Sequence, residues 1–214
     1  MSDGLSSRPV YAYVITSIQL TDGKFRQHGS APNFQGGLVT LCTCKHKDRA
    51  SPPKVNCRGP DPKDPWVGVW IAGLCSVREA RPRTLFYLML VEKTFASHAD
   101  LWARLPPPTA RAKSARLSPF GDVYEPRNST TGHPWSESSY RPSHRNHVHR
   151  THDRRHDIEA VYYGRRSRLL IGDPDASFLW TSPKLLLTAD ADAGWRSAHH
   201  RFYHCLDHFL LAFK

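Results

Sequence analysis

The chain lacks any apolar stretch long enough to cross a membrane. Its longest hydrophobic runs fall well short of the roughly 20 residues that a spanning helix needs. The polar start, Met1-Ser2-Asp3-Gly4, also lacks the apolar segment typical of a signal peptide. We therefore expect a soluble cytoplasmic protein that makes no contact with a membrane.

The chain also lacks the paired cysteine spacings of zinc sites and disulfide frameworks. Its five cysteines are odd in number, and we expect them to be reduced thiols in the cytoplasm. They are Cys42, Cys44, Cys57, Cys75 and Cys205. Two of them, Cys42 and Cys44, share one face of an expected strand, but a metal ion would need further ligands from elsewhere. We predict neither a metal site nor a cofactor.

Acidic residues are few compared with basic ones. The chain of 214 residues has 30 Lys and Arg against 19 Asp and Glu, a formal charge of +11. Twelve arginines and six of the thirteen histidines fall between Arg104 and Arg168. Arginine suits phosphate because its planar guanidinium donates two parallel hydrogen bonds. DNA or a nucleotide is therefore the expected partner, and a merely solvated, irregular arginine-rich loop is the alternative.

Apolar runs in the first half of the chain predict strands. These runs are rich in β-branched and aromatic residues, and they are Val10–Thr16, Leu38–Thr43, Trp66–Leu74 and Thr84–Glu92. The last two are nearly continuous, which favours strands covered on both faces or curled into a small barrel. The proline-rich segment Lys45–Pro65 predicts a loop.

The second half predicts short helices, short strands and one long basic arm. Ser97 is an expected cap for a helix over Ala99–Leu105, which Pro106 ends. From there to about residue 155 the chain has little apolar content, as in a lid or an irregular segment. Short strands are expected in three later runs, Ile158–Tyr163, Arg168–Ile171 and Phe178–Trp180. The final prediction is a C-terminal helix, because apolar residues recur there at helical spacing: Phe202, Cys205, Leu206, Phe209, Leu210 and Phe213.

These elements predict an α+β fold. We expect one domain over residues 1–214, with a small curled mixed β-sheet flanked by helices. The long basic segment at about residues 106–155 would be an irregular insertion, acting as an arm or lid.

An ordered set of short motifs resembles a known family. The set comprises Tyr13-Val14-Ile15-Thr16, Ala31-Pro32-Asn33-Phe34, Gly37 to Lys45, Gly68 to Gly73, Tyr87–Phe95, Gly121-Asp122-Val123-Tyr124, Leu169-Leu170-Ile171, Phe178–Trp180 and Arg196–Phe202. In this order they resemble the second of the nucleotide-modification-associated domain families of bacteria and phages. The resemblance implies a role in making or recognising modified bases in DNA, in a base-modification or phage-defence context. The strand plan is also similar to PUA-like barrels, which hold a modified base in an aromatic pocket.

The chain departs from that family pattern at three places. Val69 follows Gly68 where the family has an aspartate, Ser17–Ser30 is an insertion, and Lys45–Pro65 replaces a shorter connection. These differences bear on the geometry of the pocket more than on the fold.

A pocket for an extruded base needs an aromatic surface and groups that read hydrogen bonds. The expected ligand-binding residues on the first strand and the following loop are Tyr13, Thr16 and Asn33. Tyr124 would add a stacking wall, and Asp122 would accept from an exocyclic amine. The alternatives are a turn role for Asn33 and core packing for Tyr124.

Basic and nucleophilic residues complete the predicted site. Lys45 would contact phosphate, and Cys44 is a possible nucleophile if it is not simply packed. Arg196, His199 and His200 are expected to bind an anion at a helix start, or else to form an exposed face. For an enzyme, the catalytic candidates are Cys44, Asp122 and His199. Five histidines in the arginine-rich segment are interspersed with arginines, and this pattern favours a phosphate-binding arm over a metal site. They are His144, His147, His149, His152 and His156.

The favoured hypothesis is a nucleic-acid-binding module that recognises a modified or flipped base in DNA. An enzyme acting on a nucleobase or nucleotide is the alternative. A third possibility is an interaction subunit with protein partners in a modification or defence complex.

Overall fold

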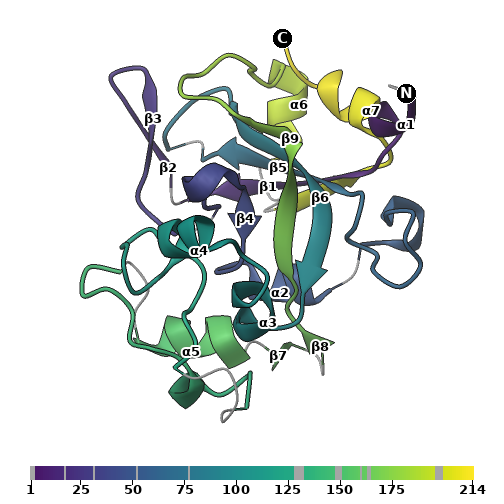
Figure 1. Cartoon of the computed structure of the whole chain (residues 1–214). Coiled ribbons are helices and arrows are strands. Elements are labelled where there is room, and N and C mark those ends of the chain that lie inside the picture. Colours follow the sequence, from purple (N-terminus) through teal and green to yellow (C-terminus); the bar gives the residue numbers. More distant parts are fainter. Residues whose placement is uncertain are drawn as a thin grey trace. The chain divides into compact units, whose positions relative to one another are not determined.

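The computed structural model divides the chain into two compact units, and Figure 1 follows the chain through both. The structure describes residues 3–16, 18–30, 32–51, 53–76, 78–127, 133–147, 151–159, 161–162, 165–195 and 200–214. The first unit comprises Met1–His28, Pro53–Glu92 and Asp175–Lys214, and the second comprises Gly29–Pro52 and Lys93–Pro174. The expectation that all 214 residues form one domain stays a prediction.

The first unit is built on four neighbouring strands. Its elements are α1 (Asp3–Ser6), β1 (Val10–Ile15), β2 (Ile18–Thr21), β3 (Lys24–Gln27), η2 (Val55–Cys57), β5 (Trp70–Cys75), most of β6 (Leu85–Phe95), α6 (Ala189–Ala193), β10 (His200–Tyr203) and α7 (Leu206–Leu210). Strand β1 lies between β10, to which it is antiparallel, and β5, to which it is parallel. β5 in turn pairs antiparallel with β6. β2 and β3 form a separate hairpin.

Both faces of this part of the sheet are buried, which explains its nearly continuous apolar runs. Alternate residues point to opposite faces of a strand. On one face Val10, Ala12 and Trp70 join a hydrophobic cluster with Trp195 and Phe209 from the C-terminal segment. On the other face, the Tyr11 ring packs against Trp66 and Phe202 at centroid distances of 5.6 and 4.8 Å.

The second unit combines short helices with the ends of two long strands. Its elements are the last residues of β6, η1 (Gln35–Gly37), β4 (Thr40–Leu41), α2 (His46–Ala50), α3 (His98–Trp102), α4 (Pro107–Lys113), η3 (Glu137–Ser139), α5 (Thr151–Glu159), β7 (Val161–Tyr162), β8 (Arg165–Arg166) and the first half of β9 (Leu169–Leu179). β4 pairs antiparallel with β9 and β7 with β8. Leu101, Val123 and Leu169 belong to one apolar cluster of this unit. Tyr124 and Tyr140 belong to another.

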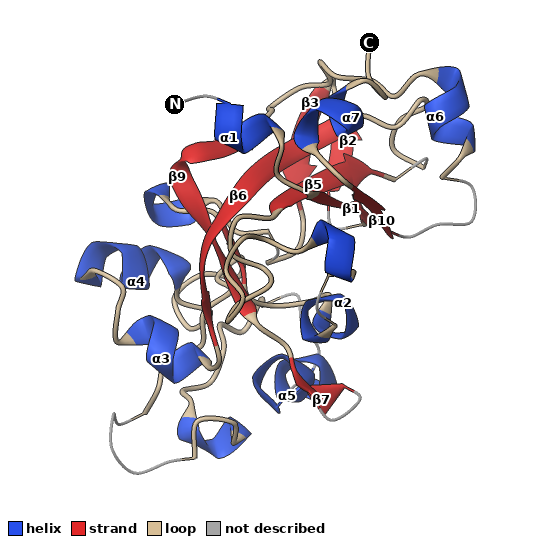
Figure 2. Ribbon diagram, turned by 90° about the vertical axis from the view of Figure 1, so that its right-hand side faces the viewer, coloured by secondary structure: helices blue, strands red, loops and turns tan. Residues whose placement is uncertain are grey.

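The expected α+β class with a curled mixed sheet is confirmed. The strand order is β10-β1-β5-β6-β9-β4, and β6 and β9 stand out in Figure 2 as the long strands. The predicted cap is also confirmed, since the Ser97 hydroxyl accepts from the backbone N–H of Asp100 at 3.1 Å at the start of α3. The strands predicted separately at Arg168–Ile171 and Phe178–Trp180 belong to the single strand β9.

The predicted long C-terminal helix is wrong. Phe202 lies in β10, where it pairs with Tyr11, and helix α7 covers only Leu206–Leu210. Pairing with the edge of β1 gives the backbone of residues 200–203 its hydrogen bonds and places the Phe202 ring against the Tyr11 ring. This tertiary pairing outweighs the helical spacing of the apolar residues.

The basic insertion is not confirmed as an irregular arm. Helix α4 begins within the proline run, because proline is tolerated in the first turn of a helix. Several side chains of this segment, among them Lys113, Asp122, Tyr124 and Tyr140, are buried. Lys45–Pro65 likewise contains helix α2 rather than loop alone. No helix within the described residues is long and apolar enough to span a membrane.

Gly73 offers a direct test of the packing within the first unit. It faces Tyr13 on β1 and Tyr87 on β6, whose hydroxyls are 2.8 Å apart. A Cβ at this position would lie 2.3 Å from both Ile15 Cδ1 and Tyr87 Cε1. The buried Tyr87 ring has little room to move, so we expect Gly73→Ala to lower the free energy of unfolding by about 1–3 kcal/mol, the usual cost of overpacking.

The measurement is urea denaturation of Gly73→Ala beside a control, Gly4→Ala, whose new Cβ meets no atom within 4 Å. Equal midpoints for the two variants would contradict the close packing of β1, β5 and β6.

Candidate nucleic-acid interface

Buried charges organise the interior of the second unit. The Lys113 ammonium and the Asp122 carboxylate are both fully buried, and the Thr40 hydroxyl lies between them. Lys113 Nζ donates to Thr40 Oγ1 at 2.9 Å, and Thr40 Oγ1 donates to Asp122 Oδ1 at 2.9 Å. The second carboxylate oxygen accepts from the Cys42 backbone N–H at 3.2 Å. Helix α4, strand β4 and the segment around Asp122 are joined by this chain of polar contacts.

Lys113 also anchors the loop before β4. Its Nζ donates to the backbone and side-chain oxygens of Asn33, both at 2.8 Å, and to the Leu38 carbonyl. Burial lowers the pKa of Lys113 to about 8, although nearby Asp122 opposes the shift. Burial likewise raises the pKa of Asp122, against the effects of Lys113, Thr40 and Cys42. Each charge therefore depends on the other, as expected for ions removed from water.

A second buried carboxylate, Asp157 on α5, accepts hydrogen bonds from two other segments of the unit. Its Oδ1 accepts from the Cys44 backbone N–H at 2.9 Å and contacts His46 Nε2. Its Oδ2 accepts from the Tyr124 hydroxyl at 3.1 Å. Asp157 thus links α5 to the start of α2 and to the chain around Tyr124.

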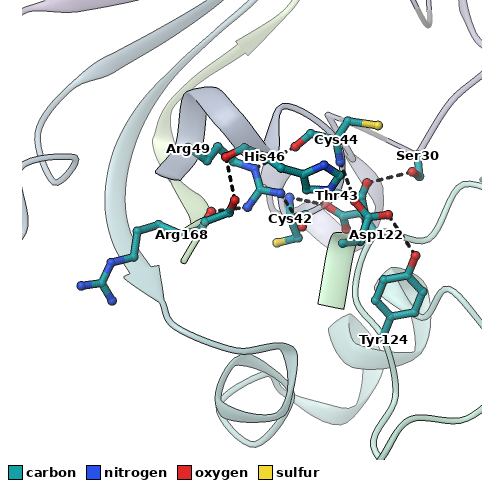
Figure 3. A network of polar contacts seen from close by, with 11 residues as sticks. Ser30, Cys42, Thr43, Cys44, His46, Arg49, Asp122, Tyr124 and Arg168 are labelled. Carbon is teal, nitrogen blue, oxygen red and sulfur yellow. Dashed lines mark hydrogen bonds and ion pairs between the residues drawn. The ribbon is translucent and has the colours of Figure 1, made fainter. Parts of the chain in front are cut away.

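The buried Arg49 guanidinium binds backbone carbonyls of the same region (Figure 3). It donates to the backbone carbonyls of Cys44 at 2.9 Å, of Cys42 at 3.1 Å and of Arg168. Cys44 and Lys45 have φ values of 57° and 51°, a left-handed conformation that is unfavourable for side chains other than glycine. Arg49 and Asp157 bind the carbonyl and the N–H of Cys44, which fixes this turn and the start of α2.

His98 is another buried polar residue of this unit. Its Nδ1 accepts from the Tyr124 backbone N–H at 3.3 Å, and its ring packs edge-on against Tyr124. Burial lowers the pKa of His98 to about 3, which outweighs the opposing influence of Asp157. The ring is therefore neutral at physiological pH and acts as an acceptor.

The surface of this unit is strongly basic, because Lys and Arg outnumber Asp and Glu in its sequence. Asp122 and Asp157 are buried, while Glu125 pairs with both Arg116 and Arg141. Many arginines remain exposed: Arg104, Arg111, Arg116, Arg127, Arg141, Arg145, Arg155, Arg165 and Arg166. Within the described residues, Arg104, Arg111 and Arg145 take part in no ion pair. Their charges are available to a polyanion.

A cavity of about 580 Å³ opens on the same unit, next to an aromatic side chain. Its lining includes His133, Trp135, Arg155, His156, Glu159 and Arg166. The guanidinium of Arg166 lies over the Trp135 ring, 3.9 Å from its centroid. The His133 ring lies 4.9 Å from Trp135, and Arg155 pairs with Glu159 at 2.8 Å.

The predicted site residues fall into both units. Tyr13, Thr16 and His200 belong to the first unit. Tyr13 is buried, with its hydroxyl beside that of Tyr87, whereas Thr16 and His200 are exposed. Arg196 and His199 lie outside the described residues, so the expected anion site around them has no structural description.

The remaining predicted residues belong to the second unit. Asn33 and Asp122 lie in the Lys113 network, and Cys44 and Tyr124 both contact Asp157. Asn33 forms a turn, since its Oδ1 accepts from the Gln35 N–H at 2.8 Å and its Nδ2 donates to the Phe120 carbonyl at 2.5 Å. These contacts favour the structural alternatives for Asn33 and for Tyr124, whose ring is buried.

Two other expected groups lie near this network. Lys45 is largely buried beside Asp48, and burial lowers its pKa. In the expected histidine cluster, His147 Nε2 bonds the Gly121 carbonyl at 2.8 Å, while His156 lines the cavity. His149 lies outside the described residues. The described part of the chain contains no group of three or more metal-binding side chains.

Sequence reasoning missed the residues that organise this unit. Lys113, Asp157 and Arg49 sit in polar segments and carry no apolar periodicity that would mark them as buried. Trp135 was also missed, although a lone tryptophan within an otherwise polar arginine-rich segment was a usable signal for a binding surface.

Comparison of the chain with models of protein families, with curated proteins and with solved structures gives no match. The motif resemblance to the nucleotide-modification-associated family therefore stays a prediction, as does the likeness to PUA barrels.

Replacement of His98 tests the effect of its burial on acid stability. Because the folded-state pKa of about 3 lies below the usual value near 6.5, the unfolded chain binds the additional proton between these values. The contribution of His98 is complete above pH 6.5 and is lost as the pH falls towards 3. We expect the free energy of unfolding to fall by about 2 kcal/mol more in the parent protein than in His98→Asn between pH 6.5 and 5.

Chemical denaturation at several pH values measures this difference. Asparagine keeps an acceptor close to the position of Nδ1, so the variant retains a partner for the Tyr124 N–H. Parallel pH profiles for the two proteins would show that His98 does not titrate as its burial requires.

The Lys113–Asp122 pair can be tested by a double-mutant cycle. Lys113→Met leaves Asp122 buried without its cation, so we expect a loss of about 3–5 kcal/mol. Adding Asp122→Asn should recover part of that loss, because no uncompensated charge then remains. The exposed Lys47→Met in the same unit serves as the control, and strict additivity of the two single losses would refute the coupling.

Proposed function

We propose that this protein is a nucleic-acid-binding module whose second unit grips the phosphate backbone. The observation that carries the proposal is the exposed arginine surface of that unit, in which Lys and Arg outnumber Asp and Glu. Lys and Arg that neutralise phosphates release bound counterions, and this supplies sequence-independent affinity.

Selectivity for a modified or flipped base in DNA is the finer part of the proposal. The sequence resemblance supports it, whereas the tyrosines first expected to stack on a base are buried in this structure. Trp135 and its cavity offer another aromatic surface within the same basic unit. Phosphate contacts fix position without reading sequence, so base selectivity would come from such a cavity.

The enzyme alternative has weaker support. Asp122 is fully buried and is held by Thr40 and the Cys42 N–H. In Figure 3 the sulfur of Cys44 points away from the His46 ring. A nucleophile needs a base within hydrogen-bonding reach, and the groups of Cys44 that bind Asp157 and Arg49 are its backbone N–H and carbonyl. Binding therefore explains the arrangement better than catalysis.

Salt-dependent binding tests the phosphate grip. We expect the logarithm of the association constant for a short DNA to fall linearly with the logarithm of salt concentration. A triple variant, Arg104→Gln, Arg111→Gln and Arg145→Gln, should bind more weakly. Its slope should also be shallower, by up to about 0.7–0.9 for each phosphate that is no longer neutralised. Fluorescence anisotropy across a salt series gives both quantities.

The control is Arg78→Gln, which removes an exposed arginine from the first unit and should leave the slope unchanged. The proposal would be refuted if binding did not depend on salt, or if the triple variant had the same slope as the parent protein.

A further inference from the structure

The cavity beside Trp135 combines the groups that hold a single nucleotide. An unstacked nucleotide presents a flat aromatic base, hydrogen-bonding groups on the base edge and a phosphate. The cavity offers an indole ring, the carboxylate of Glu159 and the guanidiniums of Arg155 and Arg166. Its volume of about 580 Å³ lies within the range usual for small-ligand sites.

Trp135 is fixed in place before any ligand arrives. Its indole N–H donates to the backbone carbonyl of Ala96 at 3.3 Å, just beyond the end of β6. The ring is half-buried, so one part packs while the rest borders the cavity. A fixed aromatic ring loses little conformational entropy when a base stacks on it.

Arg166 occupies the position over the Trp135 ring where a base could stack. Its guanidinium, a flat cation, lies 3.9 Å from the ring centroid, although the side chain as a whole is exposed. A planar base can take the same position over the indole, and the displaced guanidinium can then bind the attached phosphate. This displacement costs little, because a cation–π pair at an exposed site is only weakly stabilising.

The Arg155–Glu159 ion pair suggests which bases fit. Both side chains are partly or largely exposed, so the pair itself contributes little stability. A carboxylate accepts from exocyclic amines of bases, as Glu does from the N4 amine of cytosine. Glu159 can therefore accept from the base amine while Arg155 turns to the phosphate.

We propose that this cavity binds one unstacked nucleotide whose base carries an exocyclic amine. The base stacks on Trp135, its amine donates to Glu159, and Arg155 and Arg166 hold the phosphate. The inference rests on the proposed nucleic-acid binding and names the nucleotide that the same unit accepts. A free nucleotide offers the same chemistry as a nucleotide within a strand, so the experiment includes both.

The experiment compares three short single strands that are abasic except at one central position. That position carries cytosine, thymine or no base. We expect the cytosine strand to bind about tenfold or more tightly than the fully abasic strand, because stacking on an aromatic side chain is strongly favourable. Thymine lacks the exocyclic amine, so its strand should bind more weakly than the cytosine strand.

Variants assign the gain to the cavity. Trp135→Ala should abolish the difference between cytosine and no base, whereas Trp135→Phe keeps an aromatic ring and should retain part of it. Glu159→Gln should reduce the preference for cytosine over thymine. Arg166→Ala should weaken binding of all three strands more than Arg165→Ala does, since Arg165→Ala removes one exposed charge from the neighbouring position on β8, which does not line the cavity. Trp135→Phe also controls for a folding defect in Trp135→Ala, because phenylalanine keeps an aromatic ring packed at this position.

The outcomes separate this inference from the proposed function. Salt-dependent binding that is equally strong for all three strands, and unchanged in Trp135→Ala, overturns the nucleotide site. The proposed binding to the phosphate backbone is then still supported. If deoxycytidine monophosphate binds in a Trp135-dependent manner while no strand binds, the site stands with a free nucleotide as its ligand and the proposed function fails. Absence of binding to both the strands and the mononucleotide overturns both.

Discussion

The second unit depends on the hydrogen bonds that the buried Asp157 carboxylate accepts. Removing a carboxylate from water costs several kcal/mol unless hydrogen bonds replace its hydration. Here the replacements come from the Cys44 N–H and His46, at the start of α2, and from the Tyr124 hydroxyl, so two distant segments of the chain supply them. Arg49 adds bonds to the carbonyls that flank this centre. The left-handed turn at Cys44 and Lys45, which is unfavourable by itself, is stabilised by these contacts.

The buried carboxylates of this unit lie close to buried basic side chains. Asp122 and Asp157 contribute their charges to the interior, where Lys113, Arg49 and His46 lie close to them. The arginines of the same segments remain outside. Because buried cations balance these buried acids, the basic surface available to a polyanion comes from the excess of Lys and Arg in the unit.

Sequence patterns predicted the apolar strands well and the polar parts poorly. Val10–Ile15, Trp70–Cys75 and Leu85–Phe95 were evident because runs of β-branched and aromatic residues favour strands. The C-terminal segment was mistaken for one helix, since the pairing of Phe202 with Tyr11 depends on a strand almost two hundred residues earlier. The segment at 106–155 looked irregular because its order comes from buried polar contacts, which leave no periodic signal. Of the predicted site, Asn33, Asp122 and Tyr124 do share one unit, but as buried scaffold.

The sequence by itself determined the α+β class, the positions of the main strands and the concentration of arginine in one region. These properties follow from local composition and from the period of apolar residues. Only the tertiary structure decided which charges are buried, that Trp135 lies beside Arg166, and that the tyrosines expected to stack on a base belong to the core. Burial of a polar side chain depends on partners that distant segments supply, so the local sequence cannot specify it.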